Sequence, residues 1–154
     1  MLIIRKADGT DLNFLIKIFT LNIPKYFHKT ELDDFKKYFN SNNIETYFVI
    51  ESEGKILGAA GYACENKQTA NICWVFIDPD YHSNGLGTKL VNHCIDILKR
   101  DHQLNVIQLE TSNLTYTFYE KLNFKIQYIK KKYWPNNDDL YFMNMHLNYS
   151  NIQL

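Results

Sequence analysis

Two glycines, Gly85 and Gly87, stand between an apolar run and an amphipathic helical pattern in the stretch DPDYHSNGLGTKLV. The residues before it, TANICWVFID, predict a buried strand, and those after it predict a helix from about Asn84 to Arg100. A further strand, NVIQLET, follows. A right-handed crossover through the helix would make the two strands parallel neighbours in one sheet. The core-facing positions predicted for this helix are Leu86, Leu90, Val91, Cys94, Ile95 and Leu98.

The rest of the chain contains further segments with strand composition. These are LIIRKA, ETYFVIES, KILGAAGYAC, KIQYIKKKYW and DLYFMNMHLN. Glu53 and Gly54 separate the second from the third and have the composition of a tight hairpin turn. The residues PNND separate the last two in the same way. The chain is therefore predicted to be of the α+β class.

Three further helices are predicted. In TDLNFLIKIFTLN, Thr10 is the expected N-cap, and the core face is Leu12, Leu15, Ile16 and Phe19. In KTELDDFKKYFN, Thr30 and Asp33 are spaced as a capping pair. In LTYTFYEKLNF, the predicted core stripe is Leu114, Phe118 and Leu122, which leaves Tyr119 off that stripe.

Length and charge limit the functions to consider. The 154 residues are enough for one domain with one core, and nothing resembles a linker or a repeat, so a single domain over residues 1–154 is expected. The formal net charge is zero, which does not favour a nucleic acid or a membrane surface as partner. No secretory signal is recognisable, and the three cysteines are an odd number without the spacing of a disulfide framework or a metal site. We therefore expect a cytoplasmic protein with reduced thiols and no bound metal.

The glycine loop has the composition of an anion site. The first turn of a helix leaves backbone N–H groups without partners, and glycine lets an anion approach them closely. The same glycines would also suit a strand-to-helix turn that binds nothing. A Walker loop requires G-x-x-x-x-G-K-[ST], which is missing, and a Rossmann loop requires a third small residue where Leu90 stands. Neither motif fits, although a nucleotide such as ATP or NAD stays open as a ligand.

A third motif fits better. The stretch VFIDPDYHSNGLGTKLV resembles the acyl-CoA pyrophosphate loop of the GNAT superfamily of N-acetyltransferases, [QR]-x-x-G-x-[GA], with His82 in place of Gln or Arg. A second stretch, SNLTYTFYEKLNF, is similar to the family's N-x-x-A-x-x-[LF]-Y-E-K-x-G-F signature, with Asn123 in place of Gly. Asn113 lies one residue closer to Tyr119 than in many members. The resemblance covers residues 70–124 directly.

The resemblance implies a fold, a coenzyme and a binding segment. The fold would be a twisted, mostly antiparallel mixed sheet of about seven strands with helices on both faces. The pantetheine arm of acetyl-CoA would bond the backbone of Phe76, Ile77 and Asp78, and the glycine loop would bind the phosphates. The full set of coenzyme-binding residues that it implies is Phe76, Ile77, Asp78, His82, Ser83, Asn84, Gly85, Leu86, Gly87, Thr88, Asn113 and Tyr119.

The resemblance also implies direct transfer of acetyl from acetyl-CoA to a primary amine in a ternary complex. Tyr119 would be the general acid, because a phenol with a pKa of about 10 stays protonated at neutral pH. Glu110 is the candidate base nearest in sequence, while His28, Glu31 and a water relay stay open. The acceptor would be a small molecule or a peptide, and a homodimer is a family-level expectation. The alternative function is a non-catalytic acyl-CoA-binding sensor or interaction module.

Overall fold

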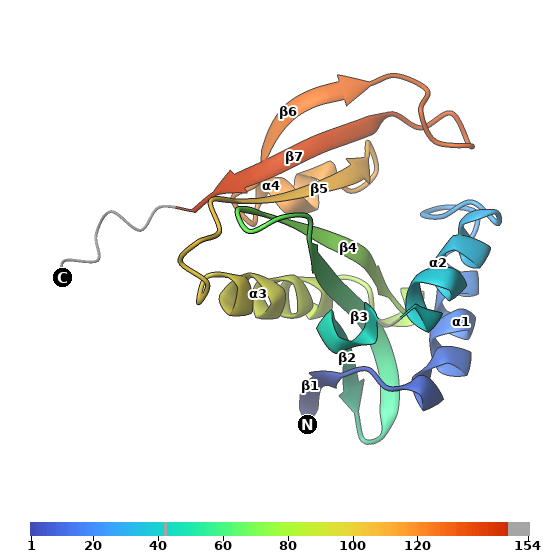
Figure 1. Ribbon diagram of the computed structural model, residues 1–154. Helices are drawn as coiled ribbons and strands as arrows, with labels where there is room; N and C mark the ends of the chain where they lie inside the picture. The colour runs from blue at the N-terminus through green and yellow to red at the C-terminus, as the bar shows by residue number, and fades with distance from the viewer. Residues whose placement is uncertain (42, 148–154) are drawn as a thin grey trace. The chain divides into compact units, whose positions relative to one another are not determined.

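The computed structural model describes residues 1–41 and 43–147. Its strands form one mixed sheet of seven strands in the order β1-β2-β3-β4-β5-β7-β6 (Figure 1). The strands are β1 (Leu2–Lys6), β2 (Tyr47–Ser52), β3 (Lys55–Cys64), β4 (Thr69–Ile77), β5 (Val106–Ser112), β6 (Lys125–Lys130) and β7 (Leu140–His146). The α-helices are α1 (Leu12–Leu21), α2 (Glu31–Asn40), α3 (Leu86–Leu98) and α4 (Tyr116–Glu120). The predicted α+β class and mixed sheet are therefore confirmed.

The pairing of the strands also follows the prediction. β4 and β5 are parallel neighbours, whereas β1–β2, β2–β3, β5–β7 and β6–β7 pair antiparallel. The β2–β3 hairpin turns at Glu53 and Gly54, which both have positive φ angles of 51° and 80°. Two consecutive positive φ angles are the conformation that a tight hairpin with right-handed twist requires.

The chain divides into two compact units. Unit 1 comprises Met1–Ala63 and Cys73–Cys94, and unit 2 comprises Cys64–Ile72 and the chain from Ile95 onward. β4 and α3 each run from one unit into the other, so the boundary cuts through regular elements rather than through a linker. The assignment of all 154 residues to a single domain stays a prediction.

Unit 1 has helices on both faces of its part of the sheet. Tyr47 and Val49 of β2 belong to an aromatic-rich core with α1 and α2, whereas Phe48 contacts the ring of His93 in α3 at 4.7 Å. Because successive side chains of a strand point to opposite faces, the two helix layers lie on opposite sides. The six positions predicted to face the core from α3 are all buried. In α1 the prediction missed Ile18, which is buried, while Leu12 and Ile16 are half-buried.

The expected helix caps were wrong. Thr10 does not cap α1, because the chain enters that helix through a 3-10 turn at Gly9–Asp11, and the Asp8 carboxylate accepts the Thr10 N–H at 2.8 Å. Thr30 is in the N-cap position of α2 but makes no capping bond with its side chain. An acidic side chain from the first turn acts instead, since the Glu31 carboxylate accepts the His28 N–H at 2.7 Å.

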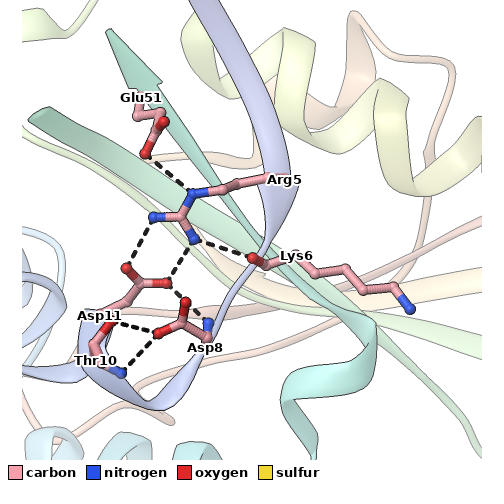
Figure 2. A network of polar contacts seen from close by, with 6 residues as sticks. All are labelled: Arg5, Lys6, Asp8, Thr10, Asp11 and Glu51. Atoms are coloured by element: carbon pink, nitrogen blue, oxygen red, sulfur yellow. Dashed lines mark hydrogen bonds and ion pairs between the residues drawn. The ribbon is translucent and has the colours of Figure 1, made fainter. Parts of the chain in front are cut away.

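An ion-pair network joins β1 to the start of α1. The Arg5 guanidinium makes two hydrogen bonds to Asp11, at 2.9 and 3.0 Å, and a third to Glu51 of β2 at 3.1 Å (Figure 2). Asp11 is 3% exposed and also accepts the Asp8 N–H, which closes a capping box. These charge-assisted bonds raise the pKa of Arg5. The network fixes the entry into α1, which lies over the aromatic core of unit 1.

The predicted core stripe of the last helix was also wrong. Leu114 is 44% exposed, whereas Tyr119 is buried at 8%. The reason is length: α4 covers only five residues and begins at Tyr116, so Leu114 lies outside it and helical spacing does not extend to Leu122. Phe124, which follows the helix, is buried in its place. In the described part of the chain, no helix is long and apolar enough to cross a membrane.

Candidate functional site

The glycine loop occupies the segment between β4 and α3 in unit 1. A short 3-10 turn at Pro79–Tyr81 follows the strand, and the Asp78 carboxylate caps it by accepting the Asp80 N–H at 3.0 Å. Ser83 and Gly85 then adopt positive φ angles of 66° and 77°. The left-handed conformation at Gly85 explains why glycine stands there, since a side chain would be strained even though its Cβ position is open.

Several consecutive backbone N–H groups of this loop lack a hydrogen-bond acceptor among the described residues. Within the described chain, the N–H groups of residues 83–88 make no hydrogen bond to another residue. The first backbone bond of α3 is from the Lys89 N–H to the Gly85 carbonyl, at 3.1 Å. Ser83, Asn84 and Gly85 are exposed. Consecutive donors at the positive end of the helix dipole form a site that favours an anion.

The strand end before the loop is held by internal hydrogen bonds. The Asp78 N–H donates to the Leu57 carbonyl at 2.8 Å, and Asp78 is buried. The Ile77 carbonyl accepts two bonds, from His82 Nε2 at 2.9 Å and from Asn22 Nδ2 at 3.0 Å. Of the backbone groups predicted to bind pantetheine, the Asp78 N–H and the Ile77 carbonyl are therefore engaged within unit 1.

His82, which stands where the motif has Gln or Arg, makes contacts within unit 1. Its ring donates to the backbone of the preceding strand and lies edge-on to Tyr26 at 5.4 Å. The side chain is half-buried. His82 thus holds the start of the glycine loop against β4 and beside the segment after α1. The sequence showed the substitution but gave no sign of this positioning role.

A backbone irregularity in β4 also escaped the sequence analysis. Trp74 has a φ angle of 51° in the middle of the strand. A bulky residue in this conformation is a genuine outlier and persists only when its surroundings hold it. The Trp74 carbonyl accepts a hydrogen bond of 2.7 Å from the hydroxyl of Tyr47, a residue with no exposed surface. The described β4–β5 ladder joins only Thr69–Asn71 to Val106–Gln108, before this point in β4.

Unit 2 holds the other predicted residues, Glu110, Asn113 and Tyr119. Tyr119 is buried in α4, with its ring centroid 4.9 Å from that of Phe118. Glu110 is exposed on β5, between the buried side chains of Leu109 and Thr111.

The register of β5 shows which face of the sheet carries α4 and which carries Glu110. Thr111 lies opposite Tyr141, and Tyr141 stacks on Tyr116 of α4 at 4.3 Å. α4, which carries Tyr119, therefore packs on the Thr111 face of the sheet. Because side chains alternate along a strand, Glu110 points to the opposite face.

Asn113 has a structural partner. Its Oδ1 atom accepts the backbone N–H of Asp139 at 3.0 Å, which ties the turn after β5 to the start of β7. Trp134 adds a second tie, from its indole N–H to the Thr111 carbonyl at 3.3 Å. The loop between β6 and β7 is thereby fastened to the end of β5.

Unit 1 supplies the other candidate bases, Glu31 and His28. The Glu31 carboxylate is half-buried, and burial raises its pKa, although the bond from the His28 N–H opposes the shift. The His28 ring contacts the Thr30 hydroxyl at 2.9 Å. Among the described residues, no group of three or more His, Cys, Asp or Glu side chains could hold a metal ion.

The sequence of this chain matches a family model. The match extends over residues 12–124 and is to the acetyltransferase (GNAT) family. The chain belongs to the GNAT family. The predicted fold and the resemblance to the GNAT family are thereby confirmed, and so is the enzyme class, an acetyl-CoA-dependent N-acetyltransferase.

Two curated relatives are similar in sequence. The ribosomal protein bS18-alanine N-acetyltransferase of Escherichia coli is 33% identical over 109 residues, covering 67% of this chain and 72% of that protein. An uncharacterized N-acetyltransferase of Methanocaldococcus jannaschii is 26% identical over 141 residues, which cover 83% of this chain. The chain spans 62% of the length of this second relative.

Two solved structures share the GNAT fold. The E. coli ribosomal-protein-S18-alanine N-acetyltransferase superposes with a TM-score of 0.81 at 22% identity, with 100% of both chains covered. An acetyltransferase structure from Salmonella typhimurium, solved with its cofactor acetyl-CoA, has a TM-score of 0.77 at 19% identity, covering 96% of this chain and 95% of that one. At these identities the likeness concerns the fold alone.

Proposed function

We propose that this GNAT protein transfers the acetyl group of acetyl-CoA to the α-amine at the N-terminus of a polypeptide. The family supports the enzyme class and the coenzyme. The acceptor is suggested by the relative at 33% identity, which is named for acetylating an alanine of ribosomal protein bS18.

The observation that carries the proposal is the run of N–H groups at residues 83–88 that have no hydrogen-bond partner among the described residues. A pyrophosphate needs several convergent donors, and this loop offers them on a backbone fixed by Gly85 and by the His82 bond to Ile77. The residues present therefore fit the phosphates of coenzyme A. When bound, acetyl-CoA supplies the thioester whose carbonyl carbon the amine attacks.

The side chains of this chain would handle the protons. The Tyr119 hydroxyl would donate its proton to the departing thiolate sulfur, since a phenol stays protonated at neutral pH. Glu110, exposed on β5, would accept a proton from the acceptor amine, either directly or through water. Asn113 would have a positioning role, because its Oδ1 atom accepts the Asp139 N–H and so fastens the start of β7 to the turn after β5.

The experiment that tests the proposal separates binding from transfer. Acetyl-CoA, ATP and NAD are compared by thermal shift, and acetyl transfer is then measured on a peptide that begins with alanine, on its N-terminally blocked form and on small polyamines. We expect stabilisation by acetyl-CoA alone and transfer to the unblocked peptide. Transfer only to polyamines would overturn the proposal that the acceptor is a polypeptide N-terminus. Binding of acetyl-CoA without any transfer would favour the non-catalytic acyl-CoA sensor.

A matched pair of variants locates the coenzyme. Gly85→Ala places a side chain at a φ of 77°, whereas Gly9→Ala places one in equally open space without a positive φ. The strain at Gly85 is about 1–2 kcal/mol, so we expect roughly tenfold weaker binding of acetyl-CoA for Gly85→Ala. Gly9→Ala should bind like the parent protein. Equal binding by both variants would place the coenzyme elsewhere.

A further inference from the structure

Although the whole chain has no net charge, its lysines are unevenly distributed. Residues 121–137 contain five lysines and neither aspartate nor glutamate. β6 lies within this segment at one end of the strand order, and among the described strands it pairs with β7 alone. All six residues of β6 are exposed. Unit 2 therefore ends in an exposed, basic edge strand.

A bulge in β6 gathers cationic and aromatic side chains on one face. Lys125 lies opposite Asn144 and Tyr128 lies opposite Phe142, because the register shifts by one residue between Ile126 and Tyr128. Asn144 and Phe142 are two residues apart and share a face, so Lys125 and Tyr128 share it as well. We call Lys125, Tyr128, Lys130 and Tyr133 the β6 basic patch.

Lys130 connects the two rings of the patch. Its Nζ atom lies 5.6 Å from the centroid of the Tyr128 ring and 5.7 Å from that of the Tyr133 ring. Tyr128 also stacks on Phe142 at 4.8 Å, yet it stays 45% exposed, and Tyr133 is 51% exposed. A flat heterocycle could stack on either ring while an attached phosphate meets the ammonium group.

The patch is bordered by few acids. Asp139 pairs at 3.1 Å with Lys131, which is outside the patch. Asp138 accepts a bond from Asn136 at 2.7 Å. Glu110 is on the same face as Tyr128 but lies across β7 from it, opposite Phe142. The two lysines of the patch lie at the two ends of β6, so a linear anion that contacts both would lie along that strand rather than across the sheet.

Strand addition is not the mode of binding that this edge favours. Lysines on an edge strand and a bulge within it are both devices that prevent pairing with another strand. The available binding groups are therefore ammonium groups and aromatic rings, not main-chain donors and acceptors. Alternating cations and exposed rings are the combination that proteins use to bind single strands of nucleic acid.

We propose that the β6 basic patch binds single-stranded nucleic acid, with phosphates on Lys125 and Lys130 and bases stacked on Tyr128 and Tyr133. The proposal is independent of acetyl transfer, because none of these residues belongs to the proposed catalytic or coenzyme-binding set. The zero net charge of the chain did not favour a nucleic acid as partner. The proposal differs from that expectation because binding depends on the local distribution of charge.

The test uses the full chain and fluorescence anisotropy with short labelled oligouridylate and oligothymidylate. We expect a Kd of about 1–100 µM at physiological salt, and a salt dependence of about 0.7 log units per phosphate contact. Lys125→Gln with Lys130→Gln should reduce that slope by about 1.4. Tyr128→Leu with Tyr133→Leu should weaken binding about 30-fold or more and leave the slope unchanged. The two oligonucleotides distinguish RNA from DNA as the source.

The matched control is Lys67→Gln with Lys99→Gln, which removes the same charge from exposed positions of unit 2 outside β6. This control should bind like the parent protein. The proposal is overturned by an absence of binding, by an equal loss in the control, or by polyglutamate binding as tightly as the oligonucleotides. Acetyl-CoA binding measured on the same variants should not change, which keeps this result separate from the proposed enzyme activity.

Discussion

The hydroxyl of Tyr47 donates a hydrogen bond of 2.7 Å to the carbonyl of Trp74, the residue at which β4 departs from regular strand geometry. The two residues are on β2 and β4, and both belong to or pack against the core of unit 1. A strand residue with a positive φ angle departs from the geometry of a regular ladder, so its carbonyl gains from a side-chain donor. The buried phenol of Tyr47 satisfies that carbonyl, and burial raises the pKa of Tyr47 so that it remains a donor.

Replacing Tyr47 with Phe is expected to lower the free energy of unfolding by about 1–3 kcal/mol, because the partly buried Trp74 carbonyl loses the donor that Tyr47 supplies. Urea unfolding followed by circular dichroism measures the change. Tyr128→Phe, on the exposed strand β6, should change stability by less than about 0.5 kcal/mol. Equal effects of the two variants would mean that the Tyr47 bond adds nothing to stability.

Tyr119→Phe tests the proposed acid. Removing the hydroxyl should lower kcat about 100-fold or more, because general acid catalysis contributes at least that factor. The dissociation constant of acetyl-CoA should hardly change, since the ring remains to pack against Phe118 and Phe124. Tyr116→Phe is the matched control in the same helix, and its kcat should be unaffected. An unaltered kcat in Tyr119→Phe would remove the acid role.

Much of the fold could be predicted because it depends on periodicity and turn composition. The apolar runs of β2 and β3 on either side of Glu53 and Gly54 predicted the hairpin, and all the positions that helical spacing assigned to the core face of α3 are buried. These signals lie within one element. α4 was misjudged because helical spacing was extended from Leu114 to Leu122, beyond a helix of five residues.

Residues of the candidate site could be predicted only where a sequence motif specifies them. The glycine loop and Tyr119 were found in this way. The sequence has no pattern that predicts the bond from His82 to Ile77, the positive φ angle at Trp74 or the bond between Asn113 and Asp139, which are 26 residues apart in the chain. Hydrogen bonds of this kind depend on tertiary geometry, which no local spacing encodes.

Arg5→Met is expected to destabilise unit 1 because it leaves the buried carboxylate of Asp11 without its cation. The expected loss is about 1–3 kcal/mol, less than for a fully buried pair, since the Arg5 side chain is 35% exposed. Lys6→Met breaks the exposed pair to Glu45 at 3.6 Å and should cost less than about 0.5 kcal/mol. Urea unfolding compares them, and similar losses would show that the network in Figure 2 is no stronger than a surface pair.

Acid should weaken the fold partly through Asp8 and Asp139. The side-chain and backbone bonds from Thr10 lower the pKa of Asp8, and the backbone bond from Lys132 lowers that of Asp139. A carboxyl with a lowered folded-state pKa contributes stability above its unfolded pKa of about 3.9, and loses it as the pH falls through the folded value. Asp8→Asn with Asp139→Asn should therefore flatten the decline in unfolding free energy below about pH 4. An unchanged decline would exclude both groups.

The three cysteines should differ in reactivity. Burial raises the pKa of Cys73 to about 11 and that of Cys94 to about 12, and only a small fraction of either thiol is ionised at neutral pH. Cys64 is exposed, so iodoacetamide should modify it first in the folded protein, although partial burial raises its pKa as well. Peptide mass spectrometry over a time course measures the order.

Unfolding in urea provides the control for this prediction, because the three thiols should then react at similar rates. Cys73 is the informative position: its Sγ atom lies 3.3 Å from the Tyr38 hydroxyl, and it precedes Trp74, which has a positive φ angle. If Cys73 reacted in the folded protein as fast as Cys64, its thiol would be activated rather than buried. That result would make a nucleophile of Cys73 and would contradict direct transfer, since an acetyl-cysteine intermediate would then compete with attack by the amine.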